Sequence, residues 1–271
     1  MAPHLSRRDV LAGAGALGML PCGAGAAAAR EVEYDPPFVP TPHLLVQKML
    51  DLAGVGASDY LIDLGCGDGR IPVAAGRRGA RALGVDLDPM RIQEAFAAAR
   101  IAEVEARVNF RIENLFRTPI YEASVIAIYL LPRVNLALRP RLLTELRPGS
   151  RIVSHAFDMG DWRPDGEDML DRRRIFLWLV PGVAGGEWTM TDAAGASFDL
   201  AFEQRFQDVT GTMTGGGRVR EVRDATLRGT RFAFTVDGDS GPLVYRGTVG
   251  EAAITAEPGA ANDGWRAVRR G

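Results

Sequence analysis

The sequence predicts an α/β fold, a doubly wound and mostly parallel sheet, followed by a β-rich C-terminal region. Three observations support this prediction. Apolar strand-like runs alternate with helix-spaced segments in the first two thirds of the chain. Short connections between such elements imply right-handed crossovers in a parallel sheet. Helical periodicity then ends near Asp171. We therefore expect an N-terminal segment over residues 1–29, a first domain over residues 35–171 and a β-rich region over residues 172–271.

Composition limits the broad class of the protein. The chain has 271 residues, 46% of them hydrophobic, and a formal net charge of −2, as in ordinary globular proteins. This charge gives no long-range attraction to nucleic acid or to an anionic membrane. Two cysteines and three dispersed histidines provide neither a disulfide framework nor a cysteine metal cluster, so we expect no metal site.

The first residues have the layout of an export leader. Arg7-Arg8 are followed by a weakly apolar Gly/Ala-rich run that extends to about Ala29, which is typical of a secretory signal. The segment resembles a twin-arginine signal, which directs export of folded proteins. It predicts a periplasmic protein, or a membrane-associated one if the leader is not cleaved. A cytoplasmic location stays open if the leader is not functional.

The expected elements of the first domain follow in order. Thr41 and Pro42 provide an N-cap and a first helical residue, and helical spacing continues until Gly54 ends the helix. Apolar runs predict five strands, of which the fourth is apolar throughout and therefore buried on both faces. These strands are expected at Tyr60–Leu64, Ala82–Asp86, Val108–Ile112, Val125–Leu131 and Arg151–Phe157. Further helices are expected near Ile71–Arg78, from Asp88-Pro89 onward and around Pro140–Leu146.

The C-terminal region predicts only strands. Ile175–Val180 and Glu187–Met190 are expected to form a strand pair, and later short runs are separated by Gly, Asp and Asn clusters. This pattern is typical of a β-meander that forms a small barrel or sandwich. Alternatively, the first hairpin of this region completes the sheet of the preceding domain.

The glycine-rich sequence DLGCGDGR, residues 63–70, lies between the first strand and the next helix. Its glycines allow the backbone to approach a ligand. Asp86 ends the following strand, where a carboxylate can accept the hydroxyl protons of a ribose. A dinucleotide loop requires a third glycine where Arg70 stands, and Asp63 and Asp68 would repel a pyrophosphate. S-adenosylmethionine is cationic and has no phosphate, so the acidic loop favours it.

These motifs resemble those of class I S-adenosylmethionine-dependent methyltransferases, which have a Rossmann-like sheet. DLGCGDG resembles their first motif, GVDLDP at residues 84–89 the second, and ENLF at residues 113–116 the third, with Asn114 where many members carry Asp. The resemblance implies S-adenosylmethionine as cofactor. It also implies a set of binding residues from the three motifs: Asp63, Gly65, Cys66, Gly67, Asp68, Asp86, Leu87, Asn114 and Leu115.

A narrower resemblance involves FVPTP at residues 38–42, DGRIPVAA at residues 68–75 and FDMGDW at residues 157–162. Similar features occur in a small family of protein-lysine methyltransferases that includes mitochondrial enzymes acting on membrane carriers and on parts of the ATP synthase. The resemblance implies that Val39, Pro40 and Thr41 lie beside the cofactor and that lysine is a candidate acceptor. The β-rich region has no counterpart in this family.

Methyl transfer is an in-line displacement that depends mainly on positioning, and a nitrogen acceptor must arrive deprotonated. Candidate catalytic residues follow the fourth and fifth strands: Tyr129, Asn135, His155 and Asp158. Structural roles are open alternatives, because Tyr129 could simply end a buried strand and His155 could be a hydrogen-bonded core residue. The chain lacks the DPPY or NPPY sequence of many nucleic-acid amino methyltransferases, so we expect a protein side chain or a small molecule as acceptor.

The sequence therefore predicts a methyltransferase. Two alternatives stay open: an exported, non-catalytic binding protein with a degenerate nucleotide fold, and an NAD-dependent oxidoreductase. The predicted leader conflicts with the first prediction, because S-adenosylmethionine is made in the cytosol. The sequence does not resolve this conflict.

Overall fold

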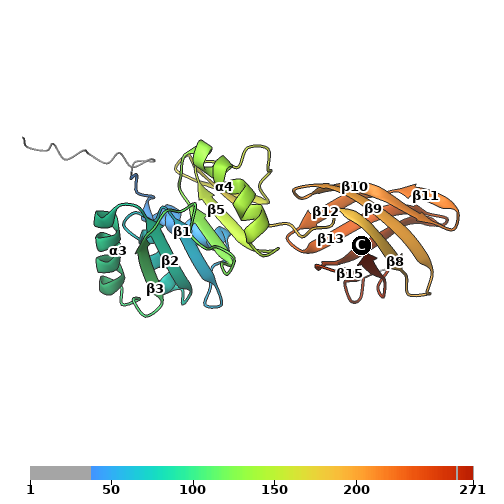
Figure 1. Ribbon diagram of the computed structural model, residues 1–271, viewed down its shortest axis with the longest axis horizontal. Helices are drawn as coiled ribbons and strands as arrows, with labels where there is room; N and C mark the ends of the chain where they lie inside the picture. Colours follow the sequence, from blue (N-terminus) through green and yellow to red (C-terminus); the bar gives the residue numbers. More distant parts are fainter. Residues whose placement is uncertain (1–37, 261, 271) are drawn as a thin grey trace, which may run out of the picture. The chain divides into compact units, whose positions relative to one another are not determined.

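The computed structural model describes residues 38–260 and 262–270. The predicted export leader, residues 1–29, lies outside the described residues. The described chain forms two sheets, one of seven strands and one of nine (Figure 1). Both parts of the predicted fold class are therefore confirmed. No helix within the described ranges is both long enough and apolar enough to cross a membrane.

The seven-stranded sheet has the order β3-β2-β1-β4-β5-β7-β6. Its first five strands run parallel, and β7 and β6 are antiparallel additions at one edge. The chain moves outward from β1 to β3 and then returns to the other side of β1 with β4. This reversal is the topological switch point, where α/β sheets bind their ligands. The strands are β1 (Tyr60–Leu64), β2 (Arg81–Asp86), β3 (Val108–Ile112), β4 (Val125–Ile128), β5 (Arg151–His155), β6 (Gly166–Leu170) and β7 (Arg173–Leu179).

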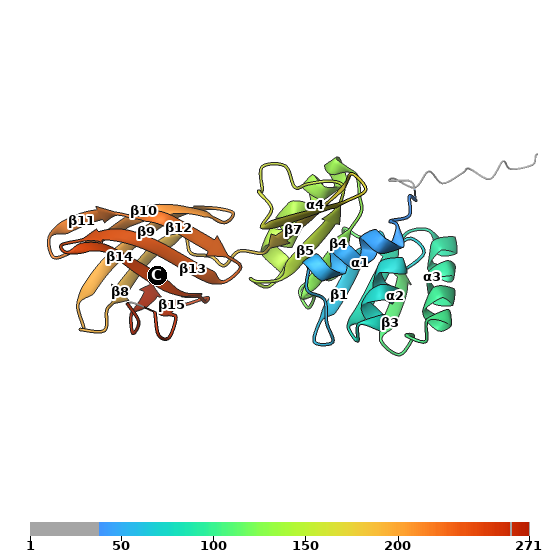
Figure 2. The same ribbon diagram turned by 180° about the vertical axis from the view of Figure 1, so that it is seen from behind.

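Helices cover both faces of this sheet (Figures 1 and 2). Alternate residues of each strand point to opposite faces, so Leu61 packs in one core and Ile62 in the other. Side chains of α1, α2 and α3 belong to the first core and those of α4 to the second. The helices are α1 (His43–Leu52), α2 (Arg70–Arg77), α3 (Pro89–Ile101) and α4 (Pro132–Glu145).

The fourth helix was predicted too short. It begins at Pro132 rather than near Pro140, and Pro140 lies inside it. A proline at the first helical position needs no hydrogen-bond partner for nitrogen, so either proline could have started the helix. Burial decides, because Val134, Leu138 and Leu142 lie at helical spacing in the core. The preceding strand consequently ends at Ile128.

The predicted pairing of Ile175–Val180 with Glu187–Met190 is wrong. β7 pairs with β5 and with β6, a strand that the sequence analysis missed. Of the first hairpin predicted for the β-rich region, only β7 joins the seven-stranded sheet, where it forms a hairpin with β6, while β8 belongs to the nine-stranded sheet. The alternative that this hairpin completes the preceding sheet is therefore confirmed for its first strand alone. The turn between β6 and β7 is made by Asp171 and Arg172, both with positive φ, +50° and +63°, as type I′ turns require. The predicted boundary between residues 171 and 172 falls within this turn.

The nine-stranded sheet is antiparallel and nearly closed, because β12 at one end packs beside β10 near the other. Its interior is filled by aromatic side chains such as Trp188, Phe234 and Trp265. The order is β11-β10-β9-β8-β16-β15-β14-β13-β12. The strands are β8 (Gly186–Thr191), β9 (Ser197–Arg205), β10 (Asp208–Gly215), β11 (Arg218–Glu221), β12 (Arg223–Arg228), β13 (Arg231–Gly238), β14 (Gly241–Val249), β15 (Ala253–Ala256) and β16 (Arg266–Arg269).

Candidate active site

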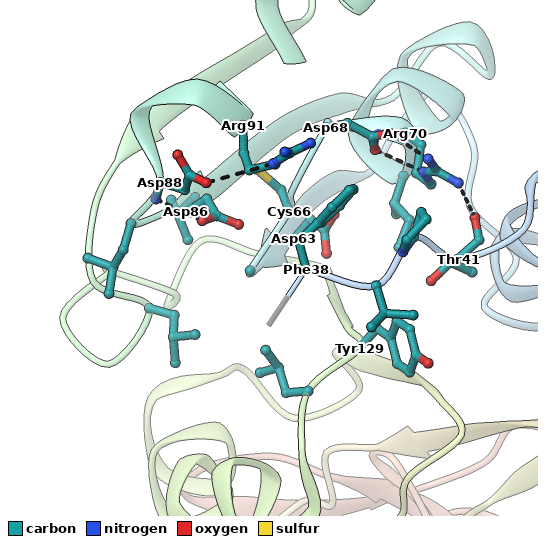
Figure 3. Close-up of a pocket in the computed structure, with 18 of the residues that line it drawn as sticks. Phe38, Thr41, Asp63, Cys66, Asp68, Arg70, Asp86, Asp88, Arg91 and Tyr129 are labelled. Atoms are coloured by element: carbon teal, nitrogen blue, oxygen red, sulfur yellow. Dashed lines mark hydrogen bonds and ion pairs between the residues drawn. The ribbon is translucent and has the colours of Figure 1, made fainter. Parts of the chain in front are cut away.

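A pocket opens at the carboxyl ends of β1, β2 and β4, at the topological switch point (Figure 3). The segment before α1 closes another side of it. Most of the predicted cofactor-binding residues line this pocket: Val39, Pro40, Thr41, Asp63, Gly65, Cys66, Asp68, Asp86, Leu87 and Leu115. Four separate stretches of chain are thus brought to one place, as parallel strands ending at the same edge require.

The glycine loop after β1 needs its glycines for two reasons. Gly65, Gly67 and Gly69 all have positive φ, between +51° and +88°, a conformation that costs other residues about 1–2 kcal/mol. Space is also limited, since a Cβ on Gly67 would stand 2.2 Å from the Phe38 ring. Phe38 therefore lies directly on the backbone of Gly67 and shields it, so Gly67 itself is not a pocket-lining residue.

Asp86 connects the two loops of the pocket. Its Oδ2 accepts a hydrogen bond from the N–H of Gly67 and its Oδ1 one from the N–H of Asp88, both at 2.9 Å. An ionised carboxylate has about four acceptor sites. Two therefore remain for the hydroxyl groups of a ligand.

Asp63 is a buried carboxylate without a protein partner. Its side chain is 2% exposed, yet it lines the pocket, and no hydrogen-bond donor in the described part of the chain reaches it. Burial raises the pKa of Asp63 well above its usual value, and the nearby charges of Asp86 and Asp68 raise it further. Such a group is stabilised by a cationic ligand.

Asp68, by contrast, is already neutralised. Its carboxylate accepts hydrogen bonds from Arg70 Nε at 2.8 Å and Nη2 at 2.5 Å, and Arg70 Nη1 donates to the carbonyl of Thr41 at 2.6 Å. Burial acts to raise the pKa of Asp68, but the Arg70 guanidinium outweighs it and the pKa is lowered. Arg70 thus fastens the segment before α1 to the glycine loop and does not crowd the sheet.

Asn114 is placed differently from the prediction. Its Oδ1 accepts a hydrogen bond from the N–H of Phe116 at 2.9 Å, which uses the side chain to form a local turn. Its neighbours Glu113 and Leu115 line the pocket instead. Further residues to which no role was predicted also line the pocket: Phe38, Ile71, Val85, Asp88, Arg91 and Leu130. Four of these lie within sequences already singled out, so a sequence signal could have found them: Phe38 in FVPTP, Ile71 in DGRIPVAA, and Val85 and Asp88 in GVDLDP.

Of the four predicted catalytic residues, Tyr129 lines the pocket and His155 packs against Tyr129. The Tyr129 ring packs against the His155 ring at a tilt of 32°, with 3.8 Å between ring centroids. His155 is 2% exposed, and its Nδ1 lies 3.1 Å from the Thr41 hydroxyl. Burial lowers the pKa of His155 to about 4, with a smaller contribution from Arg173. His155 is therefore uncharged at neutral pH and supports Tyr129 and Thr41 from behind.

The other two candidates serve the chain after β5. Asn135 is fully buried and its Nδ2 donates to the carbonyls of Phe157 and Asp158 at 3.2 and 3.3 Å. Asp158 is exposed and accepts a hydrogen bond from the N–H of Gly160 at 3.0 Å. Neither residue is among those that line the pocket.

Cys66 packs as a small apolar residue in the loop. It is 5% exposed, and its Sγ would lie 2.7 Å from a Cβ placed on Gly84. Burial raises the pKa of its thiol far above the usual value, which leaves the thiol protonated and unreactive.

Comparisons with known proteins agree with this site. Residues 63–166 match the family described as the ANTKMT methyltransferase domain. A protein-lysine N-methyltransferase of Saccharolobus islandicus is 42% identical over 150 residues, which are 53% of this chain and 93% of that protein. The adenine nucleotide translocase lysine N-methyltransferase of Mus musculus is 33% identical over 47% of this chain, and the match spans only 56% of the mouse protein.

A solved structure extends the comparison to the cofactor. An RNA methyltransferase from Salinibacter ruber, in complex with S-adenosyl-L-homocysteine, superposes with a TM-score of 0.52 and 46% sequence identity. The match covers 52% of this chain and 94% of that one. These relatives give no support to the alternative functions, a non-catalytic binding protein or an NAD-dependent oxidoreductase.

The residues of the pocket fit S-adenosylmethionine, which is its cofactor. The unpartnered carboxylate of Asp63 suits a cationic amino group, and the free acceptor sites of Asp86 suit ribose hydroxyls. A dinucleotide would bring its pyrophosphate to the glycine loop, where the Asp63 carboxylate would repel it. Since Arg70 neutralises Asp68, Asp63 is the carboxylate of the loop that favours a cation over a pyrophosphate.

Proposed function

This chain belongs to the methyltransferases with an ANTKMT-type domain, which use S-adenosylmethionine, and we propose that it methylates the ε-amino group of lysine in a protein. The observation that carries the proposal is the likeness to the archaeal protein-lysine N-methyltransferase, which extends over nearly the whole of that relative. That match covers about half of this chain.

The pocket mouth is suited to a lysine side chain. Tyr129 provides an aromatic face in the cofactor pocket, and the adjacent His155 ring holds it in place. Methylene groups pack on such a face, and an ammonium or methylammonium is attracted to it. Because His155 is uncharged, it does not repel an arriving cation. Tyr129 is thus proposed to orient the acceptor, with Thr41 and His155 as positioning residues.

The bound cofactor supplies an electrophilic methyl group on a sulfonium. The chain's own residues bind, orient and exclude water: Asp63 and Asp86 fix the polar ends of the ligand, and Phe38 closes the loop. No described side chain needs to form a covalent bond. The lysine must be deprotonated to attack.

The test is a transfer assay with radiolabelled S-adenosylmethionine and purified lysine-rich proteins. The product is hydrolysed and analysed for ε-N-methyllysine. This chain contains a single lysine, Lys48, whose Nζ pairs with Asp168 at 2.7 Å, so methylation of the enzyme itself contributes little background. An Asp86→Ala variant is the inactive control. Cofactor binding without any ε-N-methyllysine would refute lysine as the acceptor.

A second candidate function is methyl transfer to RNA. One observation favours it, namely that the Salinibacter ruber neighbour is described as an RNA methyltransferase. The same assay with total RNA, digested to nucleosides, separates the two candidates. Methylated nucleosides without methyllysine would replace the lysine proposal.

A further inference from the structure

The outer face of the nine-stranded sheet carries a continuous row of arginine and hydroxyl side chains. Strand register places seven exposed residues directly opposite one another from β12 to β9. Exposed Arg246 lies diagonally beside this row, opposite Ala233. We name these eight residues the arginine–threonine belt: Arg228, Arg231, Thr248, Thr255, Arg266, Thr191, Ser197 and Arg246.

The positive charge of the belt is not neutralised by its own members, because it contains no Asp or Glu. Within residues 38–260 and 262–270, its arginines form no ion pair and no side-chain hydrogen bond. Arg228 stands directly opposite Arg231 across the β12–β13 hairpin, and like charges at such positions are destabilising. Asp165 does interact electrostatically with Arg228, so the positive charge of the belt comes mainly from Arg231, Arg246 and Arg266.

Other arginines of the same sheet behave differently. Arg218 pairs with Asp239, Arg223 with Asp237 and Arg270 with Asp199. The arginines of the belt therefore differ from other exposed arginines of the same sheet, which are paired with aspartates. It is a place where several guanidinium groups remain available to an external anion.

We propose that the belt binds the phosphate backbone of single-stranded nucleic acid without base specificity. Guanidinium groups bind phosphate in a bidentate manner, and hydroxyl groups between them donate to phosphate oxygens. Neighbouring strands are about 4.8 Å apart, so six steps from β12 to β9 span roughly 29 Å. The belt has no aromatic side chain on which bases could stack, so recognition is electrostatic.

The shape of the sheet favours a flexible strand over a membrane. Because the sheet is nearly closed, the belt curves around it. A planar anionic bilayer could meet only part of such a belt, whereas a single strand can follow the curve. The net charge of −2 does not prevent binding of a polyanion at the belt. At ordinary ionic strength, charges more than about 8–10 Å away from a phosphate are screened. The inference is independent of the methyl acceptor.

The test is fluorescence anisotropy of a labelled oligouridylate titrated with the full chain at several salt concentrations. Each phosphate contact contributes about −0.7 to the slope of log K against log salt for single strands. Four arginine contacts therefore predict a slope of about −2.8. Arg231→Gln, Arg246→Gln and Arg266→Gln together should weaken binding at least about tenfold and reduce the slope by about 2.

The matched control carries Arg218→Gln, Arg223→Gln and Arg270→Gln. It changes the net charge equally but leaves the belt intact, and its affinity should stay within about twofold of the parent. Near-ultraviolet circular dichroism verifies that both triple variants are folded. No oligouridylate binding at low salt, or equal losses in both variants, would overturn the proposal. So would tighter, belt-dependent binding to phosphatidylserine vesicles, which would make the partner a membrane.

Discussion

Asp63→Asn should weaken S-adenosylmethionine binding without destabilising the ligand-free protein. The Asp63 carboxyl is 2% exposed and has a raised pKa, first because of burial and then because of Asp86 and Asp68. A raised folded-state pKa means that the folded protein holds the proton more tightly. The free energy of unfolding therefore falls as pH rises from about 3.8 towards the raised value. Asparagine has no titratable group, so the free energy of unfolding of Asp63→Asn should not show this fall.

Cofactor binding reverses the preference of Asp63 for its protonated form. A cationic amino group gives the Asp63 carboxylate a charged hydrogen bond, typically about 1.5–3 kcal/mol, so asparagine should raise Kd roughly 10- to 150-fold. At pH values below its raised pKa, Asp63 must release its proton when the cation binds. Isothermal titration calorimetry in buffers of different ionisation enthalpy should detect this release in the parent and a smaller one in Asp63→Asn.

Asp165→Asn is the matched control for this prediction. Burial raises the pKa of Asp165 as well, but its carboxylate accepts the N–H of Leu179 at 2.8 Å and it is not among the residues that line the pocket. Its Kd should match that of the parent. An unchanged Kd in Asp63→Asn, or an equal loss in the control, would refute the assignment of Asp63 as the partner of the cation.

Three further predictions concern the same pocket. Asp86→Ala removes acceptors for ribose and for two loop N–H groups, so calorimetry should show a loss of affinity of roughly 100-fold or more, about 3 kcal/mol; a loss below about tenfold would contradict its role. Gly67→Ala and Gly216→Ala both place alanine at positive φ, +51° and +59°, but only Gly67 is crowded. Each should lose about 1–2 kcal/mol of unfolding free energy in urea, and only Gly67→Ala should also weaken cofactor binding; equal binding by both variants would disprove the contact argument. His155 has a lowered pKa of about 4, so the free energy of unfolding should fall as pH drops from about 6.5 to 4, by up to about 3 kcal/mol. His155→Gln should flatten this dependence, and His43→Gln, at a position outside the core, should not.

Sequence reasoning succeeded where chemistry is local. The glycine loop and the strand-end carboxylate of Asp86 could be located from residue types and spacing alone, because a strand followed by a helix specifies where these groups point. Asn114 shows the limit of a motif. Its neighbours Glu113 and Leu115 both line the pocket, but Asn114 does not. The Asn114 side chain instead accepts a hydrogen bond from the N–H of Phe116.

Contacts between distant segments could not be predicted in this way. In the sequence, Arg70 stands where a dinucleotide loop requires its third glycine. In the structure it connects Asp68 to the carbonyl of Thr41, which is 29 residues away. Phe38 likewise packs on Gly67 from a distant segment. The partners of these long side chains depend on how the segment before the first helix returns to the loop, and residue spacing does not contain that information.

Three aspartates lie around the loop, and the structure gives each a different environment. Asp68 is neutralised by Arg70, Asp86 is held by two N–H groups, and Asp63 is buried with no hydrogen-bond donor from the described chain. Of the three, Asp63 has lost its hydration without compensation, and a cation is what restores the balance. The preference for a sulfonium cofactor over a dinucleotide thus depends on one carboxylate more than on the acidity of the loop.

The belt illustrates the same distinction on the surface. Arg231 and Arg266 are far apart in the sequence, and composition shows only that arginines are frequent. Antiparallel register places both in one row, while other arginines of the sheet find carboxylate partners. Register has a period of two residues, so a slip of one position would turn every member of a strand to the interior. The row of unpaired arginines therefore exists only in the folded sheet. The proposed nucleic-acid strand would bind this row, so its binding should depend on the fold and not on the number of arginines in the chain.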